Sequence, residues 1–144
     1  MEITSESEIE AIEQAIEDSP SPITIHLQQS LSFLSDRKNP DYRNSIKEAI
    51  SAVEALCKRI TNDPNATLGK ALGKLDDETQ IKTHKALTKA FENLYGYTSD
   101  ADGIRHALLD EPTIDFEDAK FMLVSCSNFV NYLTVKASKA GIEL

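Results

Sequence analysis

Apolar side chains recur three and four residues apart along most of this 144-residue chain, and no run alternates with period two for long enough to form a β-strand. The clearest case is residues 46–60, where apolar side chains form one continuous stripe and charged side chains fall outside it. Stripes of this kind are buried when helices pack against one another. The pattern therefore predicts an all-α antiparallel helical bundle with short accessory helices.

Turn and capping residues between the stripes predict where the helices begin and end. We expect residues 1–20 to form an acidic N-terminal helix, capped at Ser5 or Ser7, that packs on or extends from a bundle of residues 21–144. The further expected segments are a helix begun by Pro22, a turn at 61–65, a short helix at 67–75, a stripe at 87–94, a loop at 96–103, a short helix at 104–109, and a last helix capped by Asp115 and ended near Gly141.

The net charge of −9 is unevenly distributed. Residues 1–18 hold seven acidic side chains and no basic one, and removing these from the 24 acids leaves 17 acids against 15 bases. Overall acidity argues against broad, nonspecific binding of nucleic acid. Residues 37–89 nevertheless carry eleven bases against seven acids, which leaves room for a local phosphate site.

Several features exclude other classes of protein or have a structural interpretation. No stretch reaches the length of a membrane span, and residues 1–18 do not resemble a secretory signal, so we expect a cytoplasmic protein with no membrane partner. Cys57 and Cys126 lie on apolar stripes and are expected to pack. His26 and His84 have no partner at metal-ligand spacing, which predicts surface or helix-end histidines.

Gly69 and Gly73-Lys74 have the wrong spacing for a phosphate-binding loop, and Leu75 stands where a hydroxyl side chain is needed. The two glycines are four residues apart, and we expect them to allow a neighbouring helix to approach closely.

The most informative region is residues 94–112, where two tyrosines, an arginine, a histidine and several acids interrupt the apolar pattern. On a helix, His106 and Asp110 share one face, so the carboxylate can orient and charge the imidazole. Arg105 can reach a phosphate at the helix edge, where its guanidinium suits bidentate contact. The alternative is structural: Arg105 and His106 pair with nearby acids and hold the loop in place.

The chain resembles the C-terminal domain of bacterial abortive-infection-type proteins. The resemblance lies in DRKNPDYRNSIKEAISAVEA (residues 36–55), YGYTSD (95–100), GIRHAL (103–108) and DFEDAK (115–120), and it extends from about residue 23 to residue 133. Such domains are similar to the HEPN superfamily of helical bundles, which often form dimers and are frequent in phage-defence and toxin–antitoxin systems. The resemblance therefore implies a HEPN-like bundle, a homodimer and a partner protein.

Active HEPN proteins are metal-independent ribonucleases whose motif is an arginine and a histidine separated by four to six residues. The resemblance assigns the phosphate-binding arginine to Arg105, but residues 110–112 are Asp, Glu and Pro, so the motif histidine is missing. His106, oriented by Asp110, could take its place, because an imidazole near pKa 6.5 suits proton transfer at neutral pH. The further side chains expected to bind RNA or a nucleotide phosphate are those of Arg43, Tyr95, Tyr97 and Asp100.

Two hypotheses follow. The first is a dimerising or partner-binding module of a defence system without catalysis, favoured by the missing histidine and the acidic balance. The alternative is a metal-independent ribonuclease with Arg105, His106 and Asp110 as catalytic residues. Neither hypothesis calls for a metal or another cofactor.

Overall fold

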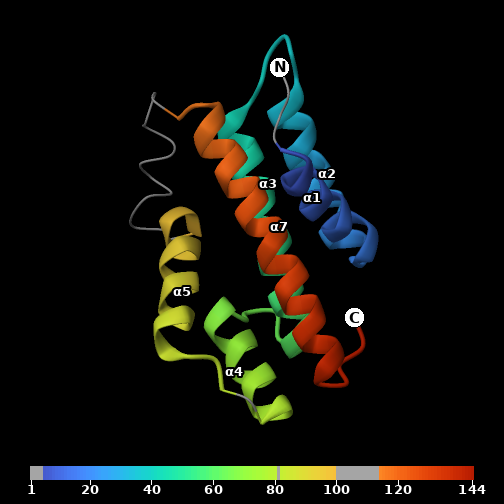
Figure 1. Ribbon diagram of the computed structural model, residues 1–144, viewed down its shortest axis with the longest axis vertical. Helices are drawn as coiled ribbons and strands as arrows, with labels where there is room; N and C mark the ends of the chain where they lie inside the picture. The colour runs from blue at the N-terminus through green and yellow to red at the C-terminus, as the bar shows by residue number, and fades with distance from the viewer. Residues whose placement is uncertain (1–4, 81, 100–113) are drawn as a thin grey trace.

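The computed structural model describes residues 5–80, 82–99 and 114–144, and within these residues the chain is helical with no strand (Figure 1). This confirms the all-α helical bundle expected from the apolar stripes. The described helices are α1 (Glu6–Asp18), α2 (Ser21–Ser35), α3 (Tyr42–Thr61), α4 (Leu68–Thr79), α5 (Lys85–Ser99) and α7 (Phe116–Lys139).

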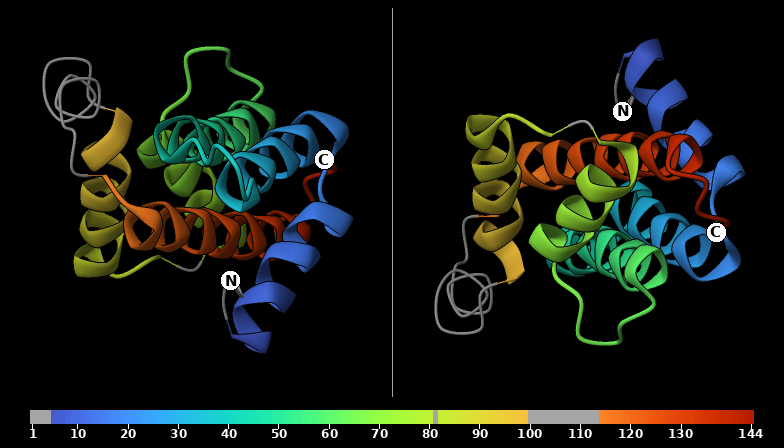
Figure 2. Two further views of the ribbon diagram at one scale, coloured as in Figure 1. Left: turned by 90° about the horizontal axis from the view of Figure 1, so that it is seen from above. Right: turned by 90° about the horizontal axis from the view of Figure 1, so that it is seen from below.

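Helices α2 and α3 form a hairpin, and α7 packs along α3 to complete the centre of the bundle. Helix α1 packs against α7 and α2. Helix α4 packs against one end of α3, and α5 contacts α4 and α3. Figures 1 and 2 show α1 and α5 on opposite sides of α7, so that one side of α7 lies between them.

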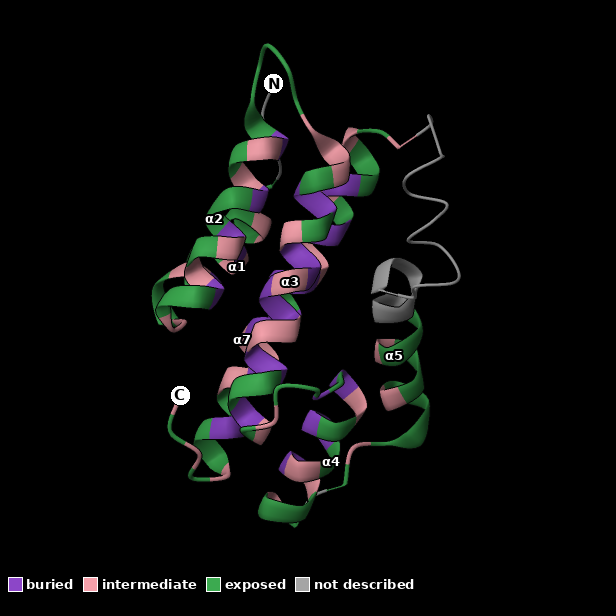
Figure 3. Cartoon of the chain, turned by 180° about the vertical axis from the view of Figure 1, so that it is seen from behind, coloured by how far each residue is buried: buried purple, intermediate pink, exposed green. Residues whose placement is uncertain are grey.

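The core follows from the apolar stripes. Buried residues, coloured purple on the cartoon of Figure 3, line the facing sides of α2, α3, α4 and α7. Burying a leucine or isoleucine side chain contributes about 1.5–3 kcal/mol relative to leaving it in water. The largest fully buried side chains are those of Ile23, Leu27, Ile46, Leu56, Ile60, Leu68, Leu72, Leu75, Leu123, Leu133, Val53 and Val130.

The ends of α7 match the expectation from sequence. The Asp115 carboxylate accepts the backbone N–H of Asp118 at 3.1 Å, and the Asp118 carboxylate accepts that of Asp115 at 3.2 Å, which forms a capping box. At the other end, Gly141 has φ = +75°, and Ile142 N–H donates to the Ala137 carbonyl at 2.9 Å. This is the left-handed helix end that favours glycine.

Two other helix starts differ in detail from the expectation. Ser5 occupies the N-cap position of α1, but its side chain makes no capping hydrogen bond. Helix α3 begins at Tyr42, where the Asp41 carboxylate accepts the backbone N–H of Asn44 at 3.0 Å. This aspartate cap was not predicted.

The loop expected at 96–103 is wrong for its first four residues, because α5 continues as far as Ser99. A single glycine in a helix costs about 1 kcal/mol relative to alanine, which weakens a helix without ending it. Glycine, unlike proline, keeps its backbone N–H and can still donate the hydrogen bond that a helix needs. The next proline in the sequence is Pro112. Residues 100–103 and the short helix expected at 104–109 lie outside the described residues.

The expectation of close helix approach is wrong at Gly73, and at Gly69 the near neighbour is a side chain of another helix rather than its backbone. A Cβ atom at Gly69 would lie 2.7 Å from Oε1 of Glu92, on α5. A Cβ atom at Gly73 would meet nothing within 4 Å, because this residue faces solvent.

Candidate functional site

The structure leaves most of the site predicted from sequence outside its described residues. Arg105, His106, Asp110 and Asp100 all fall in residues 100–113, so their proposed roles stay predictions. Tyr95 and Tyr97 lie in α5, but the structure does not describe where their side chains point.

Arg43 is the one predicted site residue whose surroundings are described. It lies half-buried in the first turn of α3. The neighbouring Tyr42 ring meets the Phe116 ring edge-on, with centroids 6.2 Å apart, which joins the start of α3 to the start of α7. A cavity of about 450 Å³ lies at this end of the bundle, lined by Leu34, Ser35, Asp36, Arg37, Pro40, Tyr42 and Phe116.

The charges in this end cavity offset one another. The Asp36 carboxylate accepts the backbone N–H groups of Asn39 at 3.0 Å and Lys38 at 2.9 Å, which lower its pKa and keep it ionised. It lies in the same wall as the Arg37 guanidinium. A phosphate entering this cavity would meet both signs of charge, so the cavity is a poor anion site.

The two cysteines pack as expected. Cys57 and Cys126 are free and buried, in α3 and α7. Burial raises the pKa of the Cys126 thiol to about 12, and burial together with the nearby Glu54 carboxylate raises that of Cys57 to about 12. A thiol with such a pKa is not a nucleophile at neutral pH.

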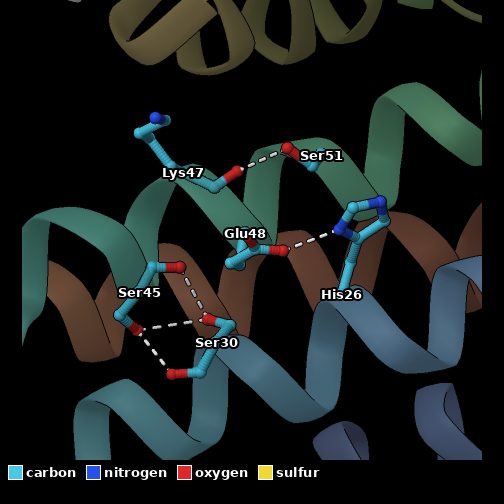
Figure 4. A network of polar contacts seen from close by, with 6 residues as sticks. All are labelled: His26, Ser30, Ser45, Lys47, Glu48 and Ser51. Carbon is cyan, nitrogen blue, oxygen red and sulfur yellow. Dashed lines mark hydrogen bonds and ion pairs between the residues drawn. The ribbon is translucent and has the colours of Figure 1, made fainter.

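Two histidines and two serines make structural contacts. His26 Nδ1 lies 2.6 Å from Oε2 of Glu48, which links α2 to α3 (Figure 4). Ser30 Oγ donates to the Ser45 carbonyl at 2.7 Å, and Ser45 Oγ donates to the Ser30 carbonyl at 2.8 Å, so a buried pair of hydrogen bonds holds the same two helices together. His84 is a helix-end histidine, as expected: its Nδ1 accepts the Ala86 N–H at 3.1 Å.

The most open apolar surface among the described residues runs along α7. Phe121 is 58% exposed and Val135 is 50% exposed, although both are large apolar side chains. Phe121 lines a groove with Glu8 of α1, and Tyr132 lines another with Phe91 of α5, so this surface of α7 lies between α1 and α5 (Figure 2). We call this surface the open face of α7, and it consists of Phe121, Val124, Ser125, Asn128, Tyr132 and Val135.

An apolar groove runs beside the open face on the α5 side. The Phe91 ring of α5 meets Phe129 and Tyr132 edge-on, with centroids 4.8 Å and 5.5 Å apart. Lys136 Nζ lies 5.9 Å from the centroid of the Tyr132 ring. These contacts fix the wall of a groove of about 470 Å³ lined by Ala90, Phe91, Ser125, Asn128, Phe129 and Tyr132.

A smaller groove lies on the α1 side. Lys120 Nζ of α7 pairs with Glu8 Oε2 of α1 at 3.4 Å, and Asn131 Nδ2 donates to the Ala11 carbonyl at 2.9 Å. These contacts hold α1 against α7. The groove has a volume of about 280 Å³ and is lined by Glu8, Glu117, Lys120, Phe121 and Val124.

Sequence reasoning missed this surface because it sought one apolar stripe for each helix. The buried stripe of α7 was predicted, whereas Phe121, Tyr132 and Val135 were left unassigned on its other side. Their spacing contained the signal, since Phe121, Asn128 and Val135 follow one another at seven residues and so form a second stripe on one face.

Within residues 5–80, 82–99 and 114–144, no cluster of three or more metal-ligating side chains occurs. In the same described part of the chain, no helix combines the length and the hydrophobicity that crossing a membrane requires. No family model matches the sequence, and comparisons with curated proteins and with solved structures give no match either.

Proposed function

We propose that this chain is a non-catalytic interaction module that forms a homodimer through the open face of α7. The observation that supports this most directly is the exposure of two large apolar side chains on one face of α7: Phe121, which lines the groove beside α1, and Val135. Exposed apolar side chains gathered on one face are typical of a site where another surface binds. The resemblance to HEPN-like domains, which often form dimers, agrees with this proposal and suggests phage defence as its biological setting.

The composition of the open face fits an interface. Phenylalanine and tyrosine are enriched at the centres of interfaces, where they bury a large area at low entropic cost. Lysine and glutamate, which are depleted there, lie at the edge of the open face as Glu117, Lys120 and Lys136. The open face therefore combines aromatic and aliphatic side chains with the polar Ser125 and Asn128 and has charged side chains at its rim, as specific interfaces commonly do.

The test is the mass of the full chain in solution. Sedimentation velocity between about 1 and 100 μM should show a change from 15.9 kDa to twice that mass. Phe121→Asp should weaken the dimer at least tenfold, because it would bury a charge without a partner. The matched control is Ser138→Asp, which adds the same charge at an exposed position outside the open face.

A metal-independent ribonuclease is the second candidate, favoured by Arg105 next to His106, which lies four residues before Asp110. Its test is cleavage of RNA in the presence of EDTA by the wild-type chain and by His106→Ala. Equal rates in the two proteins, or no cleavage by either, would exclude it.

A further inference from the structure

Apolar side chains on the outward side of α7 are spaced symmetrically about Asn128. Phe121 and Val135 lie seven residues before and after it, and Val124 and Tyr132 lie four before and after. Offsets of seven and four residues rotate a side chain by only about 20° and 40° on an α-helix, so all five share one face. The symmetry continues to the rim, because Glu117 and Lys139 lie eleven residues before and after Asn128, at about 20°.

We propose that the open face of α7 binds a second copy of itself, antiparallel, with the twofold axis at Asn128. This inference rests on the dimer proposed above and specifies its geometry. In this register Phe121 of one copy lies level with Val135 of the other, and Val124 lies level with Tyr132. Two copies related by a twofold axis bury the same patch, so each apolar pair forms twice.

Charge decides between antiparallel and parallel packing. In the antiparallel register, exposed Glu117 of one copy lies level with exposed Lys139 of the other, and this pair also forms twice. A parallel pair of α7 helices would instead bring Glu117 near Glu117 and Lys139 near Lys139. Like charges placed together across an interface are repulsive, so they select against the parallel arrangement.

The register brings one pair of like charges level with each other, Lys120 of one copy and Lys136 of the second. Each already has a partner within its own chain. Lys120 pairs with Glu8 at 3.4 Å, and Lys136 lies over the Tyr132 ring at 5.9 Å. Both side chains are therefore held to the sides of α7, where they form the rim rather than the centre.

The experiment is disulfide trapping in the full chain. Asn128→Cys places two thiols at the proposed axis, where packed helices bring Cα atoms to roughly 4–5 Å, close enough for a disulfide. Ser138→Cys is the matched control on the same helix, because ten residues from the axis its two copies would be ~30 Å apart. Cys57 and Cys126 are buried and do not interfere.

We expect oxidation to convert most of the Asn128→Cys protein into a covalent dimer and to leave Ser138→Cys monomeric on a non-reducing gel. Charge reversal gives a second readout. Glu117→Lys and Lys139→Glu should each weaken the dimer by up to about fivefold per ion pair, and the double variant should restore wild-type affinity.

The outcomes separate this inference from the proposed function. A dimer that Phe121→Asp disrupts but that Asn128→Cys does not trap would overturn the register and leave the dimer proposal standing. Faster trapping of Ser138→Cys than of Asn128→Cys would do the same. A wild-type chain that stays at 15.9 kDa at every concentration would overturn both.

Discussion

At the scale of single residues, burial decides what the two thiols can do. Cys57 of α3 and Cys126 of α7 are buried, and both have pKa values raised to about 12 from an ordinary 9.0. The folded state therefore holds their protons more tightly than the unfolded state does. As the pH rises above 9.0 toward about 12, the unfolded state loses these protons first, and the free energy of unfolding falls.

We expect the thiols of the native protein to resist modification at pH 8. Thiol titration with a chromogenic disulfide should give no signal in the native protein and two thiols per chain in denaturant. Rapid labelling of either cysteine in the native state would contradict the burial, and Ser138→Cys, at an exposed position outside the open face, provides the positive control for a reactive thiol.

A second prediction at this scale concerns the buried hydrogen-bonded pair of Ser30 and Ser45. Ser30→Ala removes a hydrogen bond between α2 and α3, and it should lower the free energy of unfolding by about 1 kcal/mol. Ser30→Val should cost more, because a larger side chain at this buried contact forces the helices apart. The measurement is urea unfolding followed by circular dichroism.

Ser51→Ala is the control for Ser30. Its hydroxyl donates to the Lys47 carbonyl within α3 at 2.8 Å and links no second helix (Figure 4). Its replacement should leave stability unchanged or slightly higher, because alanine favours a helix more than serine does. Equal losses for Ser30→Ala and Ser51→Ala would show that the buried pair contributes nothing between helices.

At the scale of elements, the two glycines of α4 have opposite surroundings. Gly73 faces solvent in a helix interior, so Gly73→Ala should raise the free energy of unfolding by about 0.5–1 kcal/mol. Gly69→Ala should gain less, because its new Cβ would meet Glu92 Oε1 at 2.7 Å. Thermal unfolding of the two variants measures the difference.

The matched test is Glu92→Ala, which removes the atom that the new Cβ would meet. In that background, Gly69→Ala should gain as much as Gly73→Ala does in the wild type. If Gly69→Ala already gains as much as Gly73→Ala with Glu92 present, the exposed Glu92 side chain moves aside at no cost and the predicted difference is wrong.

The sequence predicted helix ends correctly where a single residue decides them through its own backbone or side-chain contacts within one turn. The Asp115 cap and the Gly141 end of α7 were identified from single residues, because a carboxylate at an N-cap and a glycine past a C-terminus act within one turn. The loop predicted to begin at Gly96 is wrong because the effect of a glycine on a helix is not set by nearby residues alone. Its effect depends on whether packing, here of Phe91 on Phe129, offsets the weak propensity.

The candidate site was harder to predict than the fold. The open face of α7 lies between α1, which packs on α7, and Phe91 of α5, whose ring contacts Phe129 and Tyr132, and that arrangement depends on the packing of separate helices. Periodicity can identify the exposed Phe121 and Val135 as a second stripe, but it cannot say whether another helix of the same chain covers them. The sequence-based site at Arg105 and His106 remains a prediction.

At the scale of the whole molecule, α1 packs on the bundle rather than extending into solvent. Its acidic side chains face mainly outward, whereas Ile12 and Ala15 are buried against the bundle. Thr24 Oγ1 of α2 donates to the Ile16 carbonyl at 2.8 Å, and Asn131 Nδ2 of α7 donates to the Ala11 carbonyl. Two different helices therefore hold α1 in place.

Ile12 and Ile9 test whether this packing holds in solution, because they lie three residues apart on α1 and differ in burial. Ile12 is 3% exposed and Ile9 is 40% exposed. Ile12→Ala should lower the free energy of unfolding by about 2 kcal/mol or more, whereas Ile9→Ala should cost under about 1 kcal/mol. Hydrogen exchange should show the loss of protection centred on α1 and on the facing residues of α7. Were α1 an arm that extends into solvent, the two substitutions would have the same small effect and exchange in α7 would not change, because neither side chain would contact the bundle.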